Sequence, residues 1–400
     1  MNTTFEAAAI VREKTAQAVQ ILKEKKIDLW LTFVRETSQV KDPALDLLLG
    51  FNLTWPSALM IHKSGASVAI VGRYDVPNVE RLGAYKRVIG YDESFQQNLA
   101  TEIETLNPRR IAINYSESDP AADGLTYGMF RLLSRALAAT PYATRLVSAE
   151  AIIAALRGRK TATEVARIKA AVERTEAGIA RLKSLIHPGV GDTEIADFLH
   201  NFLIENGYGS SWEWEYCPVV TVGPDSAVGH AMPAGLRAKA GHLVHIDFGI
   251  SCYGFVSDLQ RTWYLREAGE TTIPAEIQRA WDATTAALEA GRATLKPGVQ
   301  GWEVDAVARR TLVEAGYPEF MHAFGHHIGR TAHDGATVLG PKWERYGSAT
   351  EGVVEEGNVF AIELGVSVPG RGYIGREENV VVTASGAEYL SHIQENLWVL

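Results

Sequence analysis

The carboxyl-terminal part of this chain repeats itself at a constant offset of 109 residues, and the repeat restricts the folds open to it. The segment PGV at 188–190 recurs at 297–299, and GY at 207–208 recurs at 316–317. Around these anchors each copy reads as a helix, a Pro-Gly turn, a second helix and then strands. The repeat therefore predicts one domain of two similar halves, related by a pseudo-twofold axis and beginning near residue 160.

The first half ends in two β-type runs, residues 243–250 and 255–265, joined by the turn-prone stretch SCYG. An antiparallel hairpin centred between residues 252 and 253 places Asp247 opposite Asp258. Two carboxylates about 5 Å apart repel by roughly 3 kcal/mol at an effective dielectric near 20. A shared proton or a cation must relieve that repulsion.

The second half ends in another acidic hairpin. Residues 359–368 and 375–383 pair about the turn PGRG, which puts Glu363 opposite Glu377. For either pair alone, a plain alternative is that the acids are solvated or lie at the rim of the sheet. Two hairpins that each set acid against acid favour a dinuclear metal site instead.

Histidines gather next to these acids. Four of the 11 histidines lie between residues 322 and 333, and His230 precedes the first hairpin. Four carboxylates and one imidazole would balance two divalent ions, and an oxygen-rich set suits Mn²⁺, with Co²⁺ or Zn²⁺ as alternatives. Two such ions about 3.5–4 Å apart hold a water as hydroxide and polarise a carbonyl, which is chemistry for hydrolysing an amide.

Charge and cysteine content restrict the partners and the compartment. A formal net charge of −9 disfavours nucleic acid and anionic membranes, which require a basic surface. Two cysteines outside any CxxC arrangement predict no disulfide framework and fit a reducing cytoplasm. The amino terminus lacks the apolar core of a signal peptide, and no run approaches the roughly 18 apolar residues of a membrane span. We therefore expect a cytoplasmic protein.

Residues 1–158 read as a small α/β domain without a phosphate-binding glycine loop or a nucleophile motif. The strands at 58–61 and 67–71 are expected to form a hairpin across the turn KSG. The other expected elements are helices near 6–26, 94–106 and 126–138 and strands at 27–34, 87–89 and 110–114.

Five motifs of the second domain resemble those of the pita-bread metallopeptidases, which include methionine aminopeptidase, aminopeptidase P and prolidase. The motifs are VHIDFG, SDLQRT, GHHIG, AIELG and REENVVVT. The first domain is similar to the creatinase-type domain of the proline-specific branch, so the resemblance covers nearly the whole chain. It implies an α+β homodimer with a creatinase-type domain at 1–158 and a pita-bread catalytic domain at 159–400.

The resemblance also implies the metal ligands. Asp247 would chelate one ion, and Asp258 and Glu377 would bridge both. His326 and Glu363 would complete the ligands of the second ion. Glu363 would also handle the proton of the attacking water.

Four further residues would act on the substrate. His230 and His333 resemble the two family histidines that contact the scissile amide and stabilise the tetrahedral intermediate. His322 resembles the extra histidine of Xaa-Pro enzymes. The loop 50–55, with Trp55, could cover the pocket from the same chain or from a partner subunit.

Two features bear on substrate choice. Gly375 stands where many Xaa-Pro enzymes carry an arginine, and the adjacent Arg376 would point to the opposite face of its strand. An extended peptide or a modified amide is therefore expected to suit this site better than a free Xaa-Pro dipeptide. The aromatic stretch 208–216, with Trp212 and Trp214, could line an apolar pocket or belong to the core.

The whole pattern predicts a dinuclear metal-dependent peptidase that hydrolyses the amino-terminal Xaa-Pro bond of a peptide or dipeptide through a metal-bridging hydroxide. A small amide is the other expected substrate class. The alternatives are a different hydrolase or a lyase on the same fold, and a binding module on an inactive scaffold. Five intact ligand positions argue against both, because creatinase lacks the metal set and an inactive scaffold is expected to have lost ligands.

Overall fold

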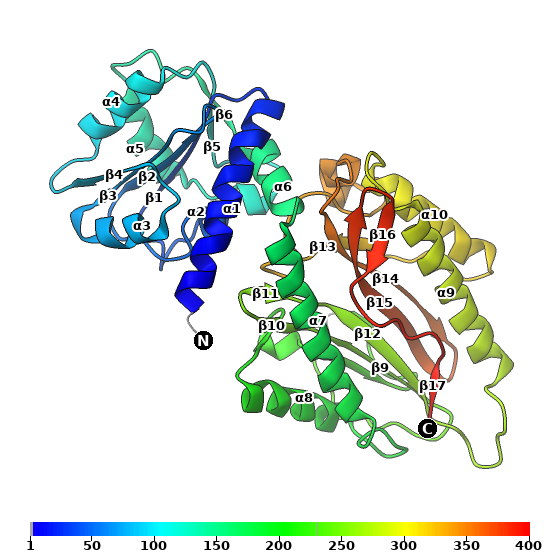
Figure 1. The fold of residues 1–400 in the computed structure, drawn as a ribbon. Coiled ribbons are helices and arrows are strands. Elements are labelled where there is room, and N and C mark those ends of the chain that lie inside the picture. Colours follow the sequence, from blue (N-terminus) through cyan, green and yellow to red (C-terminus); the bar gives the residue numbers. More distant parts are fainter. Residues whose placement is uncertain (1–2, 230) are drawn as a thin grey trace. The chain divides into compact units, whose positions relative to one another are not determined.

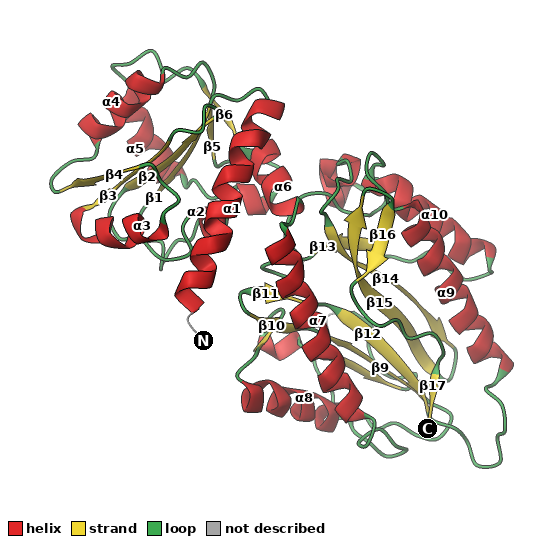
Figure 2. Ribbon diagram, viewed as in Figure 1, coloured by secondary structure: helices red, strands yellow, loops and turns green. Residues whose placement is uncertain are grey.

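The computed structural model describes residues 3–229 and 231–400 (Figure 1). The chain divides into two compact units, Met1–Arg157 and Gly158–Leu400. Both units combine helices and strands, as Figure 2 shows. Among the described residues, no helix is both long enough and apolar enough to cross a lipid bilayer.

The first unit is built on a six-stranded sheet in the order β4-β3-β2-β1-β5-β6. The β1–β2 and β2–β3 pairings are antiparallel, and the other three are parallel. The β2–β3 pairing confirms the predicted hairpin. The strands are β1 (Leu29–Val34), β2 (Ser57–His62), β3 (Ser67–Gly72), β4 (Arg87–Tyr91), β5 (Ile111–Ile113) and β6 (Leu146–Ser148).

Helices cover both faces of this sheet, because successive side chains of a strand point to opposite sides. On β1, Trp30 packs in one apolar cluster with α1, α2, α3 and α6, whereas Leu29 and Leu31 pack in another with α4 and α5. The helices are α1 (Thr3–Glu24), α2 (Leu45–Leu48), α3 (Val76–Leu82), α4 (Gln96–Leu106), α5 (Tyr127–Leu137) and α6 (Glu150–Gly158), with 3₁₀ turns at Arg73–Asp75 and Pro120–Ala122.

The second unit holds a larger sheet in the order β13-β14-β15-β12-β9-β8, with β16 beside β15 and β17 beside β12, and a small sheet in the order β11-β10-β7. The strands of the large sheet are β8 (Val219–Val222), β9 (Leu243–Phe248), β12 (Leu259–Tyr264), β13 (Gly325–His327), β14 (Val359–Val368), β15 (Gly372–Thr383), β16 (Gly386–Tyr389) and β17 (Trp398–Val399). The small sheet comprises β7 (Gly209–Ser210), β10 (Ile250–Cys252) and β11 (Phe255–Val256), and 3₁₀ turns lie at Trp214–Tyr216 and Glu344–Glu351.

The helices of the second unit reproduce the repeat seen in the sequence. They are α7 (Ala162–Leu182), α8 (Asp192–Asn206), α9 (Ala275–Thr294) and α10 (Gly301–Glu314), and α8 and α10 begin at positions that differ by 109. A capping box of Thr161 and Glu164 opens α7. In Figure 1, α7 lies over β10–β12 and α9 lies over β14–β16. Two copies of one helix pair therefore cover the two halves of the sheet.

The turn of the first acidic hairpin lies one residue later than the sequence predicts. Cys252 pairs with Phe255, so Tyr253 and Gly254 form the turn. Both adopt positive φ, 53° and 75°. A two-residue hairpin turn of type I′ requires that conformation at both positions, because its twist matches the twist of the strands.

The later turn shifts the register by two residues, so the predicted pairing of Asp247 with Asp258 is wrong. Asp247 lies opposite Gln260 instead. A shift by two keeps Asp258 and Gln260 on the same face, so both acids still meet. Each predicted strand is also broken, the first into β9 and β10 and the second into β11 and β12. At the first break, a Cβ added to Gly249 would lie 2.1 Å from the Ser257 carbonyl oxygen, so a larger residue would not fit there.

Replacing Gly254 by alanine should lower the free energy of unfolding by about 1 kcal/mol, because a Cβ disfavours the left-handed backbone conformation. Among the described atoms, the one nearest to an added Cβ is Arg330 Nη1, 3.9 Å away, so crowding should contribute little. Urea denaturation of the full chain measures the loss. Gly254→Asn is the matched control and should lose less, since asparagine tolerates this conformation. An equal loss for both variants would contradict the backbone explanation.

Candidate metal centre

Alternation along the central strands places acidic side chains on the face of the sheet away from α9. On β14, Ile362 and Leu364 join the apolar core beneath α9, and Glu363 between them points to the other face. Glu363 lies opposite Glu377 on β15, so the predicted pairing of the second hairpin is confirmed.

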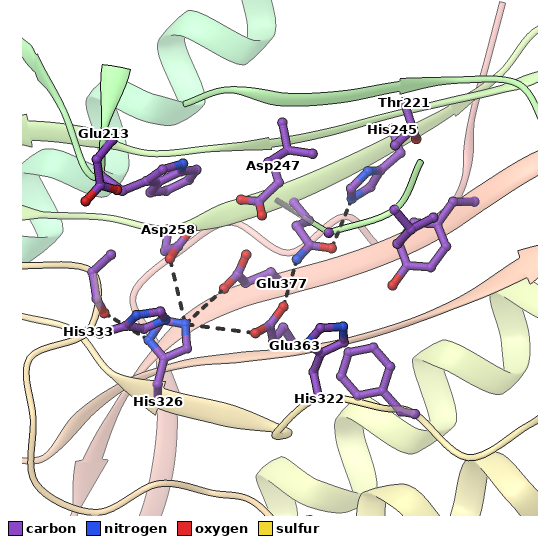
Figure 3. A pocket seen from close by; sticks show the side chains of 18 residues that line it. Glu213, Thr221, His245, Asp247, Asp258, His322, His326, His333, Glu363 and Glu377 are labelled. Atoms are coloured by element: carbon purple, nitrogen blue, oxygen red, sulfur yellow. Dashed lines mark hydrogen bonds and ion pairs between the residues drawn. The ribbon is translucent and has the colours of Figure 1, made fainter. Parts of the chain in front are cut away.

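One cross-strand row carries most of the site (Figure 3). It runs from Glu363 on β14 to Glu377 on β15, and continues to Gln260 on β12 and Asp247 on β9. Asp258 stands two residues before Gln260, which returns it to the same face. Figure 3 shows the four carboxylates converging on one region of the sheet.

His326 joins this cluster from the neighbouring strand, β13. Its Nε2 lies 3.8 Å from Asp258 Oδ2 and 3.9 Å from both Glu363 Oε1 and Glu377 Oε1. These separations are too long for hydrogen bonds. Two donor atoms that each lie about 2.1 Å from a shared ion are at most about 4.2 Å apart, so the spacing suits an ion between them.

The imidazole of His326 is oriented by the backbone. Its Nδ1 donates to the carbonyl oxygen of Ala332 at 2.9 Å, which leaves the lone pair of Nε2 facing the carboxylates. Burial, together with the neighbouring His333, lowers the pKa of His326 to about 3. His326 is therefore neutral, which is the form that binds a metal.

The four carboxyl groups of the cluster all have raised pKa values. Burial raises the pKa of Asp247 to about 7 and that of Glu363 to about 8. Burial also raises the pKa values of Asp258 and Glu377 well above their usual range, and the neighbouring carboxylates add to the effect. Carboxyl groups in this state hold protons near neutral pH unless a cation replaces them.

Several of the described carboxylate oxygens of the cluster lack hydrogen-bond partners, which bears on whether a metal ion would fit there. Within the described part of the chain, Asp247 Oδ1, Asp258 Oδ1 and Glu377 Oε2 are buried without a hydrogen-bond partner. Such an oxygen is costly unless a donor or a cation satisfies it. Donor atoms of Asp258, His326 and Glu377 also lie within 4.8 Å of one another. The residues therefore fit a divalent metal centre with mostly oxygen ligands.

A cavity of about 190 Å³ opens over the cluster, and His322 and His333 both line it. The His333 ring meets the His326 ring edge to face, with centroids 4.4 Å apart. The His322 ring lies 5.5 Å from that of Phe320. The structure thus brings two of the predicted substrate residues to the metal cluster. The third, His230, lies outside the described residues.

Trp55 belongs to the first unit. Its ring packs 5.9 Å from that of Tyr74 and 5.7 Å from that of Tyr91. The predicted contact of Trp55 with substrate stays a prediction. In the second unit, Trp212 lines the cavity, whereas Trp214 stacks on His200 with ring centroids 4.1 Å apart. The stretch therefore contributes one aromatic side chain to the cavity wall, next to that of Glu213.

Among the polar residues of the cavity wall that were not predicted from the sequence, His245 and Gln260 stand nearest in the chain to predicted ligands. Each stands two residues from a predicted ligand, His245 before Asp247 and Gln260 after Asp258. That spacing puts a side chain on the same face of a strand. The spacing was therefore a usable signal for both residues.

The described strand segment around Gly375 has no arginine side chain on the face toward the cavity. Arg376 points to the opposite face, as predicted, with its guanidinium 4.3 Å from the centre of the Trp281 ring. A Cβ added to Gly375 would lie 2.3 Å from both His245 Nε2 and Gln260 Oε1. A larger side chain at 375 would therefore displace both residues.

The free energy of unfolding of the metal-free chain should fall as pH rises from about 5 to 8. The folded state keeps protons on Asp247 and Glu363, with pKa values of about 7 and 8, where an unfolded chain with carboxyl pKa values near 4 has lost them. The cluster therefore favours folding most at low pH. Mn²⁺ should remove much of this dependence, because it replaces the protons.

Thermal unfolding at pH 5.5 and pH 8, with chelator and with Mn²⁺, measures this effect. Asp258→Asn removes one charge from the cluster, and its metal-free form should show a weaker pH dependence than the parent chain. That difference separates the cluster from the other titrating groups. A parent chain and variant with the same dependence would contradict the assignment.

Comparison with known proteins identifies the family. The model of metallopeptidase family M24 matches residues 166–384. The peptidase YqhT of Bacillus subtilis, named as uncharacterized, is 23% identical over 316 residues, which cover 78% of this chain and 81% of the relative.

Solved structures share the fold. An Xaa-Pro dipeptidase from Bacillus anthracis has a TM-score of 0.74 at 24% identity, covering 98% of this chain and 100% of its own. An X-Pro aminopeptidase from Thermotoga maritima has a TM-score of 0.70 at 23% identity, covering 96% and 99%. The predicted pita-bread fold with an amino-terminal α/β domain is thereby confirmed. Since the matched family segment spans more than half of the chain and contains all five clustered side chains, this protein belongs to metallopeptidase family M24.

Proposed function

We propose that this metallopeptidase binds two divalent ions and hydrolyses the amino-terminal Xaa-Pro bond of peptides. One observation carries the proposal: a neutral imidazole nitrogen lies within 3.9 Å of three carboxylate oxygens, with a fourth carboxylate in the same cross-strand row. Buried acids at this density need protons or cations to relieve their repulsion, and divalent ions can replace the protons. The solved structures that share the fold include an Xaa-Pro dipeptidase and an X-Pro aminopeptidase, which supports the choice of bond.

Five residues would hold the ions, and they are Asp247, Asp258, His326, Glu363 and Glu377. Their four negative charges balance two divalent cations. Mostly oxygen ligands favour Mn²⁺, with Co²⁺ and Zn²⁺ as alternatives. When bound, the ions supply Lewis acidity and lower the pKa of water.

Glu363 is proposed to move the proton of the attacking water. Its side chain is 23% exposed and lines the cavity, whereas that of Glu377 is only 2% exposed. The carboxylate of Glu363 can therefore contact both a substrate in the cavity and the other acids of the cluster. We propose that His333, whose ring contacts that of His326, donates to the scissile carbonyl. We also propose that His322, which lines the cavity, faces the residue after the bond.

The cavity wall favours an uncharged substrate segment. Of the described residues that line it, none is a lysine or arginine. A free dipeptide carries a carboxylate directly after its prolyl ring, and that charge would have to be desolvated there without a lysine or arginine partner among the described residues. Val219, Phe320 and Tyr373 supply apolar surface instead. We therefore propose an extended peptide as the substrate.

Two substitutions separate metal binding from proton transfer. Glu377→Ala should lose metal and activity together, because it removes a carboxylate from the centre of the cluster. Glu363→Gln should keep more metal yet lose turnover by about 10²–10⁴-fold, since an amide oxygen can bind an ion but cannot accept the proton. Metal content per chain and peptide hydrolysis are measured on both. Glu388→Gln, an exposed acid on β16, is the control and should change neither. Near-wild-type rates for both site variants would refute the assignment.

The substrate class is tested with three peptide series and the Mn²⁺-loaded protein. Xaa-Pro-Xaa tripeptides should be cleaved with at least about tenfold higher kcat/KM than Xaa-Pro dipeptides, because burying an unpaired carboxylate costs more than 1.4 kcal/mol. Matched Xaa-Ala-Xaa peptides should be cleaved with a lower kcat/KM than either Xaa-Pro series. Faster cleavage of the alanine series would remove the proline preference. Two bound ions with no cleavage of any series would favour another hydrolase, a lyase or an inactive scaffold.

A further inference from the structure

A second cross-strand row, made largely of small residues, lies beside the acidic row. Gly365 on β14 is opposite Gly375 on β15, and Thr262 on β12 is opposite His245 on β9. Thr262 Oγ1 donates to the Gly375 carbonyl oxygen at 2.9 Å, which joins the two pairs. Each of these residues stands two positions from a member of the acidic row and shares its face. The two glycines leave room above the sheet.

Two rings fill that room. A Cβ added at Gly365 would lie 2.1 Å from Tyr373 Oη, and one added at Gly375 would lie 2.3 Å from His245 Nε2. The two rings meet edge to face, with centroids 5.2 Å apart and planes at 84°. The residue His245 is only 3% exposed. The imidazole is thus enclosed by the glycine backbone on one side and by the phenol ring on another.

From this enclosed position His245 holds Gln260. His245 Nε2 lies 3.0 Å from Gln260 Oε1, and Gln260 Nε2 donates to Glu363 Oε2 at 3.0 Å. In its ionised form, which is the form that binds a metal, Glu363 can only accept, so the amide nitrogen faces Glu363 and the amide oxygen faces the imidazole. His245 therefore donates through Nε2, and the chain of hydrogen bonds runs in one direction to the acid cluster.

A second buried glutamine, Gln394, has a purely structural role and serves for comparison. Gln394 exchanges both hydrogen bonds of its amide with the backbone of Thr262, at 3.1 and 2.7 Å. Gln260 instead uses its amide on one imidazole and one carboxylate of the cluster, and it lines the cavity. Its register position between Asp247 and Glu377 puts an uncharged side chain among the acids.

We propose that Gln260, itself held by His245, is a positioning residue for Glu363. With Oε2 bound by the amide, Oε1 of Glu363 faces His326 Nε2 and is ready to bind an ion. This inference rests on the proposed function, because it assigns Glu363 to the metal centre. Hydrogen bonds that orient a metal ligand typically change metal affinity or activity by about 10–100-fold when they are removed.

The test compares Gln260→Met with Gln394→Met. Both changes keep the side-chain volume and delete two buried hydrogen bonds, but only the first releases Glu363. Gln260→Met should weaken Mn²⁺ binding by about 10–100-fold and lower kcat with little change in KM. Gln394→Met should lower the unfolding temperature and leave Mn²⁺ affinity and kcat unchanged. Calorimetric titration with Mn²⁺ alone gives a readout that does not depend on activity.

Variants at His245 test whether it acts through Gln260. His245→Phe keeps a ring of similar size and removes the donor, so it should weaken Mn²⁺ binding in the same direction. Combined with Gln260→Met it should cost no more than Gln260→Met alone, since both changes break one chain. His245→Gln retains a nitrogen donor and should recover most of the affinity.

The outcomes separate this inference from the proposed function. Equal Mn²⁺ affinity in the Gln260→Met and Gln394→Met proteins, or additive losses in the double variant, would overturn the positioning role even if the parent chain cleaves peptides. If the parent chain binds Mn²⁺ and cleaves none of the peptides, the proposed function fails. The ranking of Mn²⁺ affinities would then still decide whether Gln260 orients Glu363.

Discussion

Repulsion among four buried carboxylates is the interaction that the second unit of this protein must relieve in order to stay folded. The register of the sheet sets Glu363 against Glu377 and brings Asp247 and Asp258 onto the same face. Like charges across a ladder destabilise a sheet, so this arrangement persists only with protons or cations among the acids. The pKa values of about 7 and 8 at Asp247 and Glu363 express that demand for positive charge. A divalent centre satisfies it without protons.

The elements around the acidic row keep its donors in place. His326 is turned toward the acids by the carbonyl of Ala332, which belongs to the loop that also carries His333. That loop is anchored by a buried ion pair, because Lys160 Nζ lies 2.8 Å from Asp334 Oδ2. Lys160 directly precedes the cap of α7. The start of the first helix pair therefore supports the histidines that belong to the second half of the repeat.

The face next to the acids is neutral and partly apolar, and this follows from the glycine at residue 375. Gly375 leaves space that His245 and Gln260 occupy, so an arginine at that position would have to displace both. The adjacent Arg376 is committed to the other face, against Trp281. The proposed substrate preference and the proposed support of Glu363 therefore share one structural basis, the missing side chain at residue 375.

Features that depend on local periodicity and turn chemistry could be predicted from the residues alone. The repeat predicted two helix pairs, and strand alternation about a Pro-Gly turn predicted the pairing of Glu363 with Glu377. The same reasoning misplaced the first turn, because a tyrosine at Tyr253 adopts positive φ and nothing in its residue type favours that. The motifs also named the acids and His326 that the structure gathers into one cluster. The contacts that the neutral residues make across the sheet depend on the tertiary structure instead. Gln260 and Glu363 are 103 residues apart in sequence and meet because β12, β15 and β14 are neighbours in one sheet, which no local signal encodes.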